Sequence, residues 1–410
     1  MSKYIMAQEN GRIIPKEDKI FALNGRAKAR IAKEGKDSVI NATIGALLDD
    51  QGKLVVMKSV GEGIKRLKLE DYAEYAPIGG TPGFKEAIKN VAFAGFETDR
   101  HVRVISTPGG TGALRNAVSD YSKIGDKVLT SDWYWGPYST ICQEIGRTID
   151  TYQLFNDEGK FNNQAFGAKV RELALAQGQL VILLNTPAHN PTGYSLSDED
   201  WDSVIKILNG DDLKDTKIVL LVDTAYVDFA GDPIEYRNFL PKLEELNVNV
   251  LPLIAYSASK TYTLYGMRCG ALICMAKTKE IADEFQSVTE FSCRGSWSNG
   301  VRAAQALMEI IHGDAELSEH VAEERAMYRN MLIERGRTFE EELGRLGIES
   351  VPFDSGFFAC IACDDPDAIS AKLEEKGVYA VPLAKGIRIS IASISKTECK
   401  VVAEALKEVL

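Results

Sequence analysis

The stretch KIVLLVDTAY, from Lys217 to Tyr226, joins a continuous apolar run to a carboxylate, Asp223. A strand whose side chains are nearly all apolar is buried on both faces, which is typical of parallel sheets covered by helices on both sides. The run therefore predicts an interior strand of such a sheet. Asp223 is expected at the carboxyl end of that strand, where a polar side chain either caps the strand or serves a ligand.

Similar short apolar runs lie on both sides of this stretch, and helical patterns separate them. This alternation predicts an α/β fold, in which a large domain has a mostly parallel central sheet between helices. The other expected strands are VRVIS (Val102–Ser106), KVLTS (Lys127–Ser131), LVILLN (Leu180–Asn185), LIAYS (Leu253–Ser257) and GALICM (Gly270–Met275).

The pattern changes from about Ala315, where AELSEHVAEERAMYRNMLIERGRTFEEELGRLG is typical of one long charged amphipathic helix. Strand-like segments around another helix follow, VPFDSGFFACIAC and IRISIAS, and they predict a smaller α+β domain. The first stretch of the chain lacks a core of its own and is expected to join that domain. The predicted division is residues 1–50 as an N-terminal arm and part of the small domain, 51–310 as the large domain and 311–410 as the small C-terminal domain.

Composition excludes several classes of function. The chain has 410 residues, 45% of them hydrophobic, and a net charge of −11, which argues against a nucleic-acid surface or an anionic membrane as the main partner. The N-terminal residues lack the apolar core of a signal peptide, and no later run stays apolar long enough to cross a bilayer. We therefore expect an acidic cytoplasmic protein.

Cysteine and histidine usage predicts neither a disulfide framework nor a metal site. The seven cysteines are an odd, scattered set, so reduced thiols are expected. Cys360 and Cys363 have CxxC spacing, but they lie in an apolar, strand-like run, which indicates core packing. The four histidines include no pair with ligand spacing.

Ligands of open α/β sheets bind at the carboxyl ends of the strands, and several distinctive residues are expected there. Gly109, Gly110, Thr111 and Gly112 form a glycine-rich turn that opens a helix and could present N–H groups to a phosphate. The turn matches neither GxGxxG nor the Walker pattern, so a simple tight turn explains it equally well. Asn190 precedes a proline, which is also typical of a turn.

Three further features each have an ordinary explanation and a functional one. Lys260, in SASKTYTLYGMRCG, is either a surface lysine or a reactive amine at a strand end. Trp133 and Trp135 are either core residues or a wall on which a flat cofactor stacks. Arg388 alternates with isoleucines, so it is either solvated or directed into a cleft, where its fork would grip a carboxylate.

Taken together, these features call for one ligand. A phosphate cradle, a carboxylate for a protonated ring nitrogen, an aromatic wall and a lysine amine for an aldehyde describe pyridoxal phosphate.

The chain resembles the class I aminotransferases, the fold-type I pyridoxal-phosphate enzymes related to aspartate aminotransferase. The resemblance extends from NATIGALLDD near residue 41 to GIRISIASIS near residue 386. Its most specific motifs are HNPTG (His189–Gly193), DTAY (Asp223–Tyr226) and SASKTYTLYGMR (Ser257–Arg268), in the order of that family. It implies a homodimer that moves an amino group between an amino acid, with aspartate or an aromatic residue favoured, and a 2-oxo acid such as 2-oxoglutarate.

The resemblance also implies roles for individual residues. The catalytic residues would be Lys260, which bonds the cofactor aldehyde, Asp223, the partner of the ring nitrogen, and Tyr226, which with Asn190 donates to the ring hydroxyl. Trp133 would stack on the ring. The phosphate would be held by Gly110, Thr111, Ser257 and Arg268, with Tyr75 and Ser298 reaching the phosphate of the neighbouring subunit. The substrate would meet Arg388 at its α-carboxylate, Asn190, Gly45 and, from the partner subunit, Arg294 at a side-chain carboxylate.

The chain departs from the family pattern at three places. Gly109 stands where many aspartate aminotransferases have a phosphate-binding serine, SWSNG replaces a proline-containing segment, and WYW leaves Trp133 and Trp135 as alternatives for the stacking ring. A carbon–sulfur β-lyase or an amino-acid decarboxylase on the same fold is the alternative enzyme. A ligand-sensing regulator would need an added basic DNA-binding domain, for which this acidic chain has no spare segment.

Overall fold

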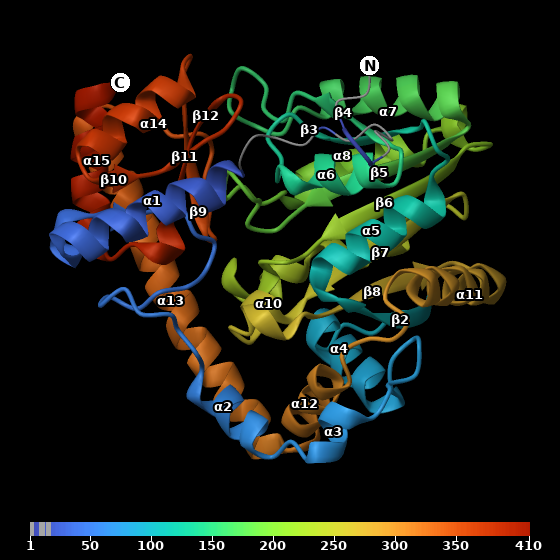
Figure 1. Cartoon of the computed structure of the whole chain (residues 1–410). Helices are drawn as coiled ribbons and strands as arrows, with labels where there is room; N and C mark the ends of the chain where they lie inside the picture. Colours follow the sequence, from blue (N-terminus) through green and yellow to red (C-terminus); the bar gives the residue numbers. More distant parts are fainter. Residues whose placement is uncertain (1–3, 8–12, 14–17) are drawn as a thin grey trace.

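The structure is a computed structural model that describes residues 4–7, 13 and 18–410. Its centre is a seven-stranded sheet in the order β2-β8-β7-β6-β5-β3-β4 (Figure 1). The pairs from β7 to β4 are parallel, whereas β8 is antiparallel to both of its neighbours, which confirms the predicted mostly parallel sheet. The strands are β2 (His101–Pro108), β3 (Lys127–Ser131), β4 (Thr148–Tyr152), β5 (Gln179–Asn185), β6 (Lys217–Asp223), β7 (Val250–Ser257) and β8 (Cys269–Ala276).

The two faces of β6 feed two separate hydrophobic cores. Val219 and Leu221 pack in one core, and Ile218, Leu220 and Val222 pack in the other. The continuous apolar run is therefore a consequence of burial on both faces, because successive side chains of a strand point to opposite sides. The helices of the first core are α5 (Gly109–Tyr121), α6 (Pro137–Glu144) and α11 (Lys279–Ser296), and those of the second include α4 (Pro82–Phe93), α7 (Asn163–Gln177), α8 (Asp198–Leu208) and α9 (Phe239–Glu244).

The C-terminal part contains two small sheets. One pairs β1 (Ile40–Asn41) with β10 (Val378–Tyr379), and the other has the order β11-β12-β9. The pairing of β1 with β10 places Ile40 and Asn41 beside Val378 and Tyr379 of the C-terminal part. The remaining elements here are α1 (Lys19–Glu34), η1 (Lys36–Ser38), β9 (Phe358–Ala362), α14 (Pro366–Glu375), β11 (Val381–Pro382), β12 (Gly386–Ser390), η6 (Ile391–Ser393) and α15 (Lys396–Val409).

The domain boundaries stay a prediction. Residues 1–3, 8–12 and 14–17 of the predicted arm lie outside the described residues, and the boundary predicted at 310 and 311 falls within α12 (Arg302–Gly313).

The described residues also form shorter elements: α2 (Lys58–Lys65), α3 (Leu69–Ala73), α10 (Ala258–Thr261), η2 (Asp211–Leu213), η3 (Val227–Phe229), η4 (Glu235–Arg237) and η5 (Tyr265–Met267).

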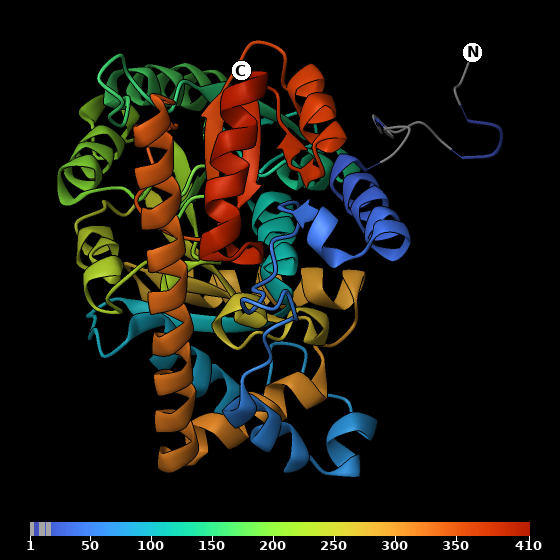
Figure 2. The same cartoon turned by 90° about the vertical axis from the view of Figure 1, so that its left-hand side faces the viewer.

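The predicted long helix is α13 (Ala315–Leu346), which runs along one side of the molecule (Figure 2). It packs on α2 and α12 towards one end and on α15 and η6 towards the other. Its Arg335 is 0% exposed and donates to the carbonyl oxygens of Leu48 (2.9 Å) and Ala392 (3.2 Å) and to Asp50 Oδ1 (2.7 Å). This side chain therefore connects α13 to the segment that follows β1 and to η6.

A glycine contact fixes the start of β8 against the start of α5. A Cβ atom on Gly270 would lie 2.5 Å from the carbonyl carbon of Gly109, a backbone atom that no rotamer change can move. We expect Gly270→Ala to lower the free energy of unfolding by about 1–3 kcal/mol, measured by urea denaturation of the cofactor-free protein. Gly344→Ala is the control, because Gly344 lies in α13 with open space around it, and the change should gain up to about 1 kcal/mol. Equal midpoints for Gly270→Ala and the wild type would contradict the close contact.

Candidate functional site

A cavity of about 270 Å³ lies at the carboxyl ends of β5, β6 and β7, between the large sheet and the C-terminal part. It contains most of the residues that the sequence analysis singled out. The predicted site residues that line it are Gly45, Gly110, Thr111, Asn190, Asp223, Tyr226, Ser257, Lys260, Arg268 and Arg388. Further lining residues are Ile20, Leu114, Trp135, Asn185, Ala225, Ser259 and Phe358.

Lys260 lies in α10, the single helical turn that directly follows β7. Its Nζ atom is 5.2 Å from the centroid of the Tyr226 ring. Burial lowers the pKa of Lys260 to about 8; Asp223 opposes this shift and Arg268 adds to it. A larger fraction of the amine is therefore neutral near pH 7 than for an exposed lysine, and only the neutral amine is a nucleophile or a base.

Asp223 ends β6 and is 5% exposed. Its Oδ2 atom accepts a hydrogen bond from the Tyr138 hydroxyl at 2.6 Å, and Oδ1 accepts one from the Ala225 N–H at 3.1 Å. Burial raises the pKa of Asp223, whereas these hydrogen bonds and the charge of Lys260 oppose the rise. The arrangement provides a buried carboxylate whose charged form a cationic partner in the cavity would stabilise.

A hydrogen-bonded chain joins the side chains opposite Lys260. Arg388 Nη1 donates to Asn190 Oδ1 at 3.4 Å, and Asn190 Nδ2 donates to the Tyr226 hydroxyl at 3.2 Å. Asn185, which the sequence analysis did not single out, accepts from the Asn190 N–H at 2.6 Å and donates to the Asp223 carbonyl at 2.8 Å. The strand ends of β5 and β6 are thus locked to the HNPTG turn.

Arg388 is a buried cation with spare hydrogen-bonding capacity. Its Nη2 donates to the Thr43 carbonyl at 3.0 Å, and its guanidinium group lies 4.2 Å from the centroid of the Phe358 ring. Its Nε has no hydrogen-bond partner among the described residues, and burial lowers the pKa of the group. A buried guanidinium with a free donor suits a carboxylate ligand.

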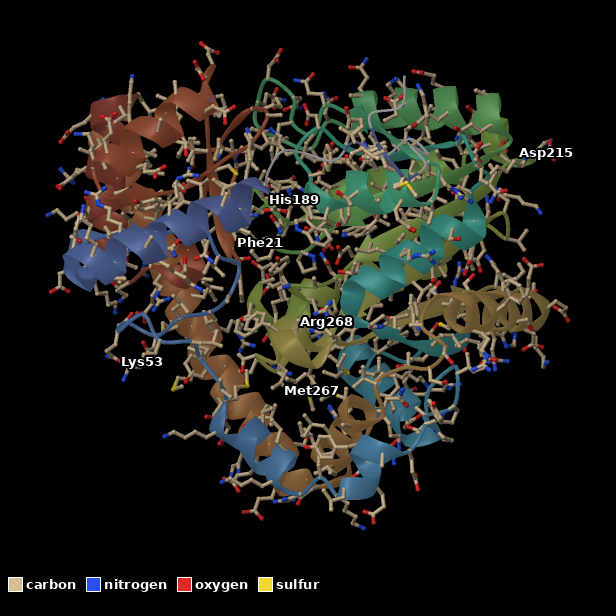
Figure 3. The ribbon with its side chains drawn as sticks, in the orientation of Figure 1. Phe21, Lys53, His189, Asp215, Met267 and Arg268 are labelled. Atoms are coloured by element: carbon tan, nitrogen blue, oxygen red, sulfur yellow. The ribbon has the colours of Figure 1, made fainter. Side chains whose placement is uncertain are left out.

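The opposite end of the cavity is suited to an oxyanion. Gly109 has a φ of +70°, and a Cβ atom there would lie 2.5 Å from Arg268 Nη2. Glycine at this position therefore lets Arg268 approach the N-terminus of α5. Arg268 Nη1 also lies 3.4 Å from the Ser259 hydroxyl oxygen, and Ser257, close to Gly110, lines the same cavity. Figure 3 marks Arg268 near the middle of the molecule, beside Met267. Helix N–H groups, hydroxyls and a guanidinium are typical of a phosphate site.

Of the two predicted tryptophans, Trp135 lines the cavity. Its ring packs edge-to-face on Tyr138, with centroids 5.5 Å apart. Trp133 is 6% exposed in the hydrophobic core, and its ring centroid lies 5.6 Å from Lys385 Nζ. Trp133 therefore lies in a less suitable position than Trp135 for the predicted stacking on a cofactor. The turn before α6 directs the two side chains differently, so that Trp133 packs in one hydrophobic core and Trp135 against the other.

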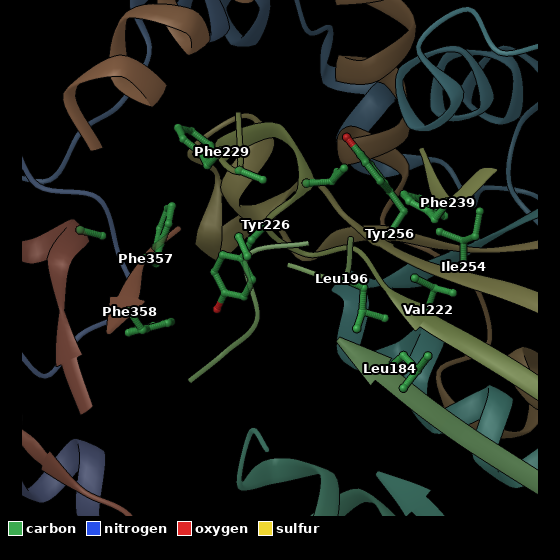
Figure 4. Close-up of a cluster of buried hydrophobic side chains, with 14 of the residues drawn as sticks. Leu184, Leu196, Val222, Tyr226, Phe229, Phe239, Ile254, Tyr256, Phe357 and Phe358 are labelled. Carbon is green, nitrogen blue, oxygen red and sulfur yellow. The ribbon is translucent and has the colours of Figure 1, made fainter. Parts of the chain in front are cut away.

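Aromatic rings also surround Tyr226. Its ring centroid is 5.2 Å from that of Phe357 and 5.9 Å from that of Phe358, both from the C-terminal part. Figure 4 shows Tyr226 between these rings and the strand side chains Leu184 and Val222. This packing leaves the Tyr226 hydroxyl accessible to Asn190 Nδ2, which donates a hydrogen bond to it.

Tyr75, Arg294 and Ser298 lie outside this cavity. Tyr75 is 89% exposed, and Arg294 Nη1 donates to the Ser298 hydroxyl at 2.7 Å. Asn299, beside Ser298, donates to the carbonyl of Ala76 at 2.6 Å, so the predicted intersubunit residues lie in one neighbourhood.

The cysteines are free thiols. Cys360 is buried and donates to the Pro191 carbonyl at 3.2 Å, and Cys363 is half-buried. Within residues 4–7, 13 and 18–410, no group of three or more His, Cys, Asp or Glu side chains is placed to hold a metal ion. Over the same described residues, every helix is too short or too polar to cross a membrane.

Known proteins resemble the chain over almost its whole length. Residues 37–406 match the family model for aminotransferase class I and II. The mitochondrial aspartate aminotransferase of Arabidopsis thaliana is 27% identical over 90% of this chain and 85% of that protein. The aromatic-amino-acid aminotransferase of Paracoccus denitrificans is 28% identical over 96% and 97%.

Solved structures agree with this result. An aminotransferase from Anaerococcus prevotii is 35% identical over 99% of both chains, with a TM-score of 0.96. The fold is also shared with the aromatic-amino-acid aminotransferase of Burkholderia pseudomallei, solved covalently bound to pyridoxal phosphate (23% identity over all of both chains, TM-score 0.80). These similarities do not favour the β-lyase or decarboxylase alternative. The chain belongs to the aminotransferase class I and II family and is a pyridoxal-phosphate-dependent aminotransferase.

Proposed function

We propose that the cavity passes an amino group from aspartate or an aromatic amino acid to a 2-oxo acid such as 2-oxoglutarate. The observation that carries this proposal is that Lys260 lines one cavity with two buried charged groups, the Asp223 carboxylate and the Arg388 guanidinium. The names of the relatives, aspartate and aromatic-amino-acid aminotransferase, support these donors.

The residues present fit pyridoxal phosphate. A Cβ atom on Gly110 would lie 3.2 Å from Ser257 Cβ, so glycine keeps the phosphate end open. Burial raises the pKa of Asp223, its two hydrogen-bond donors oppose that rise, and a protonated ring nitrogen would favour the charged carboxylate further. In this proposal the phosphate is held by Gly110, Thr111, Ser257 and Arg268, the ring nitrogen by Asp223, the ring hydroxyl by Asn190 and Tyr226, and the ring face by Trp135.

The side chains of the cavity have separate tasks in the proposed reaction. When bound, the cofactor supplies a reactive aldehyde and an electron-accepting ring. Lys260, as a neutral amine, would take the proton from the substrate Cα and deliver it to the carbon that was the cofactor aldehyde. Arg388 would hold the α-carboxylate through its free Nε and an Nη, which orients the Cα–H bond towards Lys260. Ile20 and Phe358 would keep water from the reacting atoms.

A homodimer would complete the site. Tyr75, Ser298 and Arg294 lie in the neighbourhood that a second copy of the chain would need, with Tyr75 and Ser298 serving its phosphate and Arg294 a side-chain carboxylate. The same region exposes apolar side chains, which supports an interface: Leu69 (84%), Tyr72 (59%) and Phe291 (81%). A cytoplasmic location stays part of the proposal; one relative is named cytoplasmic, whereas others are named mitochondrial.

The donor can be identified from a half-reaction. The protein is loaded with pyridoxal phosphate, and its absorption spectrum is recorded before and after aspartate or tyrosine is added without an oxo acid. We expect the visible band to convert to a near-ultraviolet band with one or both donors, because the amino group then stays on the cofactor. Lys260→Ala is the control and should not convert. A visible band that neither donor changes would contradict the proposed donors.

The two tryptophans can be separated by their effect on ligand affinity. Trp135→Ala should weaken the binding of pyridoxamine phosphate roughly tenfold, because a stacked ring is worth on the order of 1 kcal/mol. Trp133→Phe should leave this affinity within about twofold and lower the thermal midpoint instead, because Trp133 is a core residue. Fluorescence titration measures the affinity. The reverse pattern would return the stacking role to Trp133.

The pKa of Lys260 can be measured in the cofactor-free protein. Because burial disfavours the ammonium form, the amine should lose its proton near pH 8 rather than near 10.4, the usual lysine value. The rate of acylation at Lys260, followed by peptide mass spectrometry, should therefore rise with pH and reach half its plateau near pH 8. Urea-unfolded protein serves as the control and should titrate about two pH units higher. A folded-state midpoint near 10 would show that Lys260 is solvated.

A further inference from the structure

Three consecutive residues after Lys260 are anchored to three different elements. The Thr261 hydroxyl donates to Asp228 Oδ2 at 2.6 Å, and the Tyr262 hydroxyl lies 2.6 Å from His312 Nε2. Thr263 Oγ1 accepts from the Met57 N–H at 3.1 Å. These contacts matter because α10 has only four residues, and one helical turn has little stability of its own.

Asp228 is itself held in place by a second interaction, with Arg237. Its carboxylate is 3% exposed and forms an ion pair with Arg237 Nη2 at 2.6 Å. Arg237 in turn donates to the carbonyls of Ala92 at 2.9 Å and Val91 at 3.0 Å, at the end of α4. Asp228 is therefore a rigid acceptor for Thr261.

The charge of Asp228 persists over the working range of pH. Burial alone would raise its pKa, but the guanidinium groups of Arg237 and Arg325 and the Thr261 hydrogen bond lower it to about 2. Arg237 and Arg325 face it from η4 and α13, and His312 lies in the same cluster, where burial and Arg325 lower its pKa to about 4. Thr261 thus meets a carboxylate at any pH near neutrality, and hydrogen bonds to a charged acceptor are the stronger ones.

The position of Asp228 links this anchor to the site. It lies in η3, two residues after Tyr226, and Thr261 directly follows Lys260. One hydrogen bond therefore joins the segment that carries Tyr226 to the turn that carries Lys260, whose Nζ lies 5.2 Å from the Tyr226 ring centroid.

We infer that Thr261 and Asp228 are positioning residues, which hold the half-buried Lys260 side chain with its amine beside the Tyr226 ring. The inference rests on the proposed function of Lys260. Neither side chain lines the cavity, so the pair acts through Lys260 and not on the substrate.

Thr261→Val is the variant that tests the pair, because it keeps the volume and removes the hydroxyl. Asp228 itself is a poor target, since its loss would leave Arg237 buried without a counter-ion. We expect Thr261→Val to lower kcat by roughly ten- to a hundredfold with KM within about twofold, since a misplaced catalytic group costs rate rather than binding. Thr261→Ser keeps the donor and should recover most of the lost kcat.

A second readout needs neither cofactor nor turnover. If the pair holds the half-buried Lys260 in place, its loss gives the amine more contact with water, so the acylation midpoint of Lys260 should rise from about pH 8 towards the usual lysine value. Thr261→Ser should stay near the wild-type midpoint. The matched control is Thr130→Val in β3, which removes a buried hydroxyl that donates to the Leu183 carbonyl at 3.0 Å and should move neither kcat nor the midpoint.

The outcomes separate this inference from the proposed function. A raised Lys260 midpoint in Thr261→Val, rescued by serine, supports the pair even if neither aspartate nor tyrosine proves to be a donor. Wild-type kcat and an unchanged midpoint in Thr261→Val, with only a lower thermal midpoint, would overturn the pair and leave the proposed donors untouched.

Discussion

The buried carboxylate of Asp223 at the end of β6 is the constraint on which the rest of the site depends. A carboxylate in an apolar interior is costly unless hydrogen bonds and a counter-charge compensate it. Tyr138 and the Ala225 N–H provide the hydrogen bonds, and Lys260 provides the nearby cation. The same apolar surroundings lower the pKa of Lys260, so one environment shifts the pKa of both groups to which the proposal assigns the chemistry.

Two features of the fold bring distant residues to this point. The parallel strands β5, β6 and β7 end side by side, which places their terminal side chains at one edge of the sheet. Arg388 arrives from β12, in the C-terminal part, and α13 connects that part to α12 and α2. Arg335, buried in α13, bonds the Ala392 carbonyl four residues beyond Arg388. The position of Arg388 over the sheet edge therefore depends on the packing of a helix that does not line the cavity.

Much of this could be predicted from the sequence, and the remainder has physical reasons. Apolar runs predicted the interior strands because burial on both faces leaves a strong pattern, but β4 was missed because TIDTY is mostly half-buried and polar. Lys260, Asp223 and Arg388, which line the cavity, were predicted as site residues because each is unusual at its place in the pattern. Tyr138, Asn185 and the Thr261–Asp228 pair were not, because their roles come from contacts across the fold. The choice between Trp133 and Trp135 depends on the direction of a turn, which spacing does not encode.

The charges of the cavity explain why such a site suits anionic substrates in an acidic protein. Lys260, Arg268 and Arg388 contribute three potential cations, and Asp223 is the carboxylate that faces them among the lining residues described. The whole chain carries a net charge of −11, so this group of cations contrasts with the overall charge of the protein. In a cavity whose walls have a low dielectric constant, the electric field of the lining charges is focused towards the opening. This focusing raises the local concentration of anions there. Amino acids and 2-oxo acids share a carboxylate at the reacting end, and a free Arg388 Nε at the inner wall would orient both in the same way. A single positively charged cavity can therefore serve both halves of an amino-group exchange, because donor and acceptor present the same anionic group to the same guanidinium.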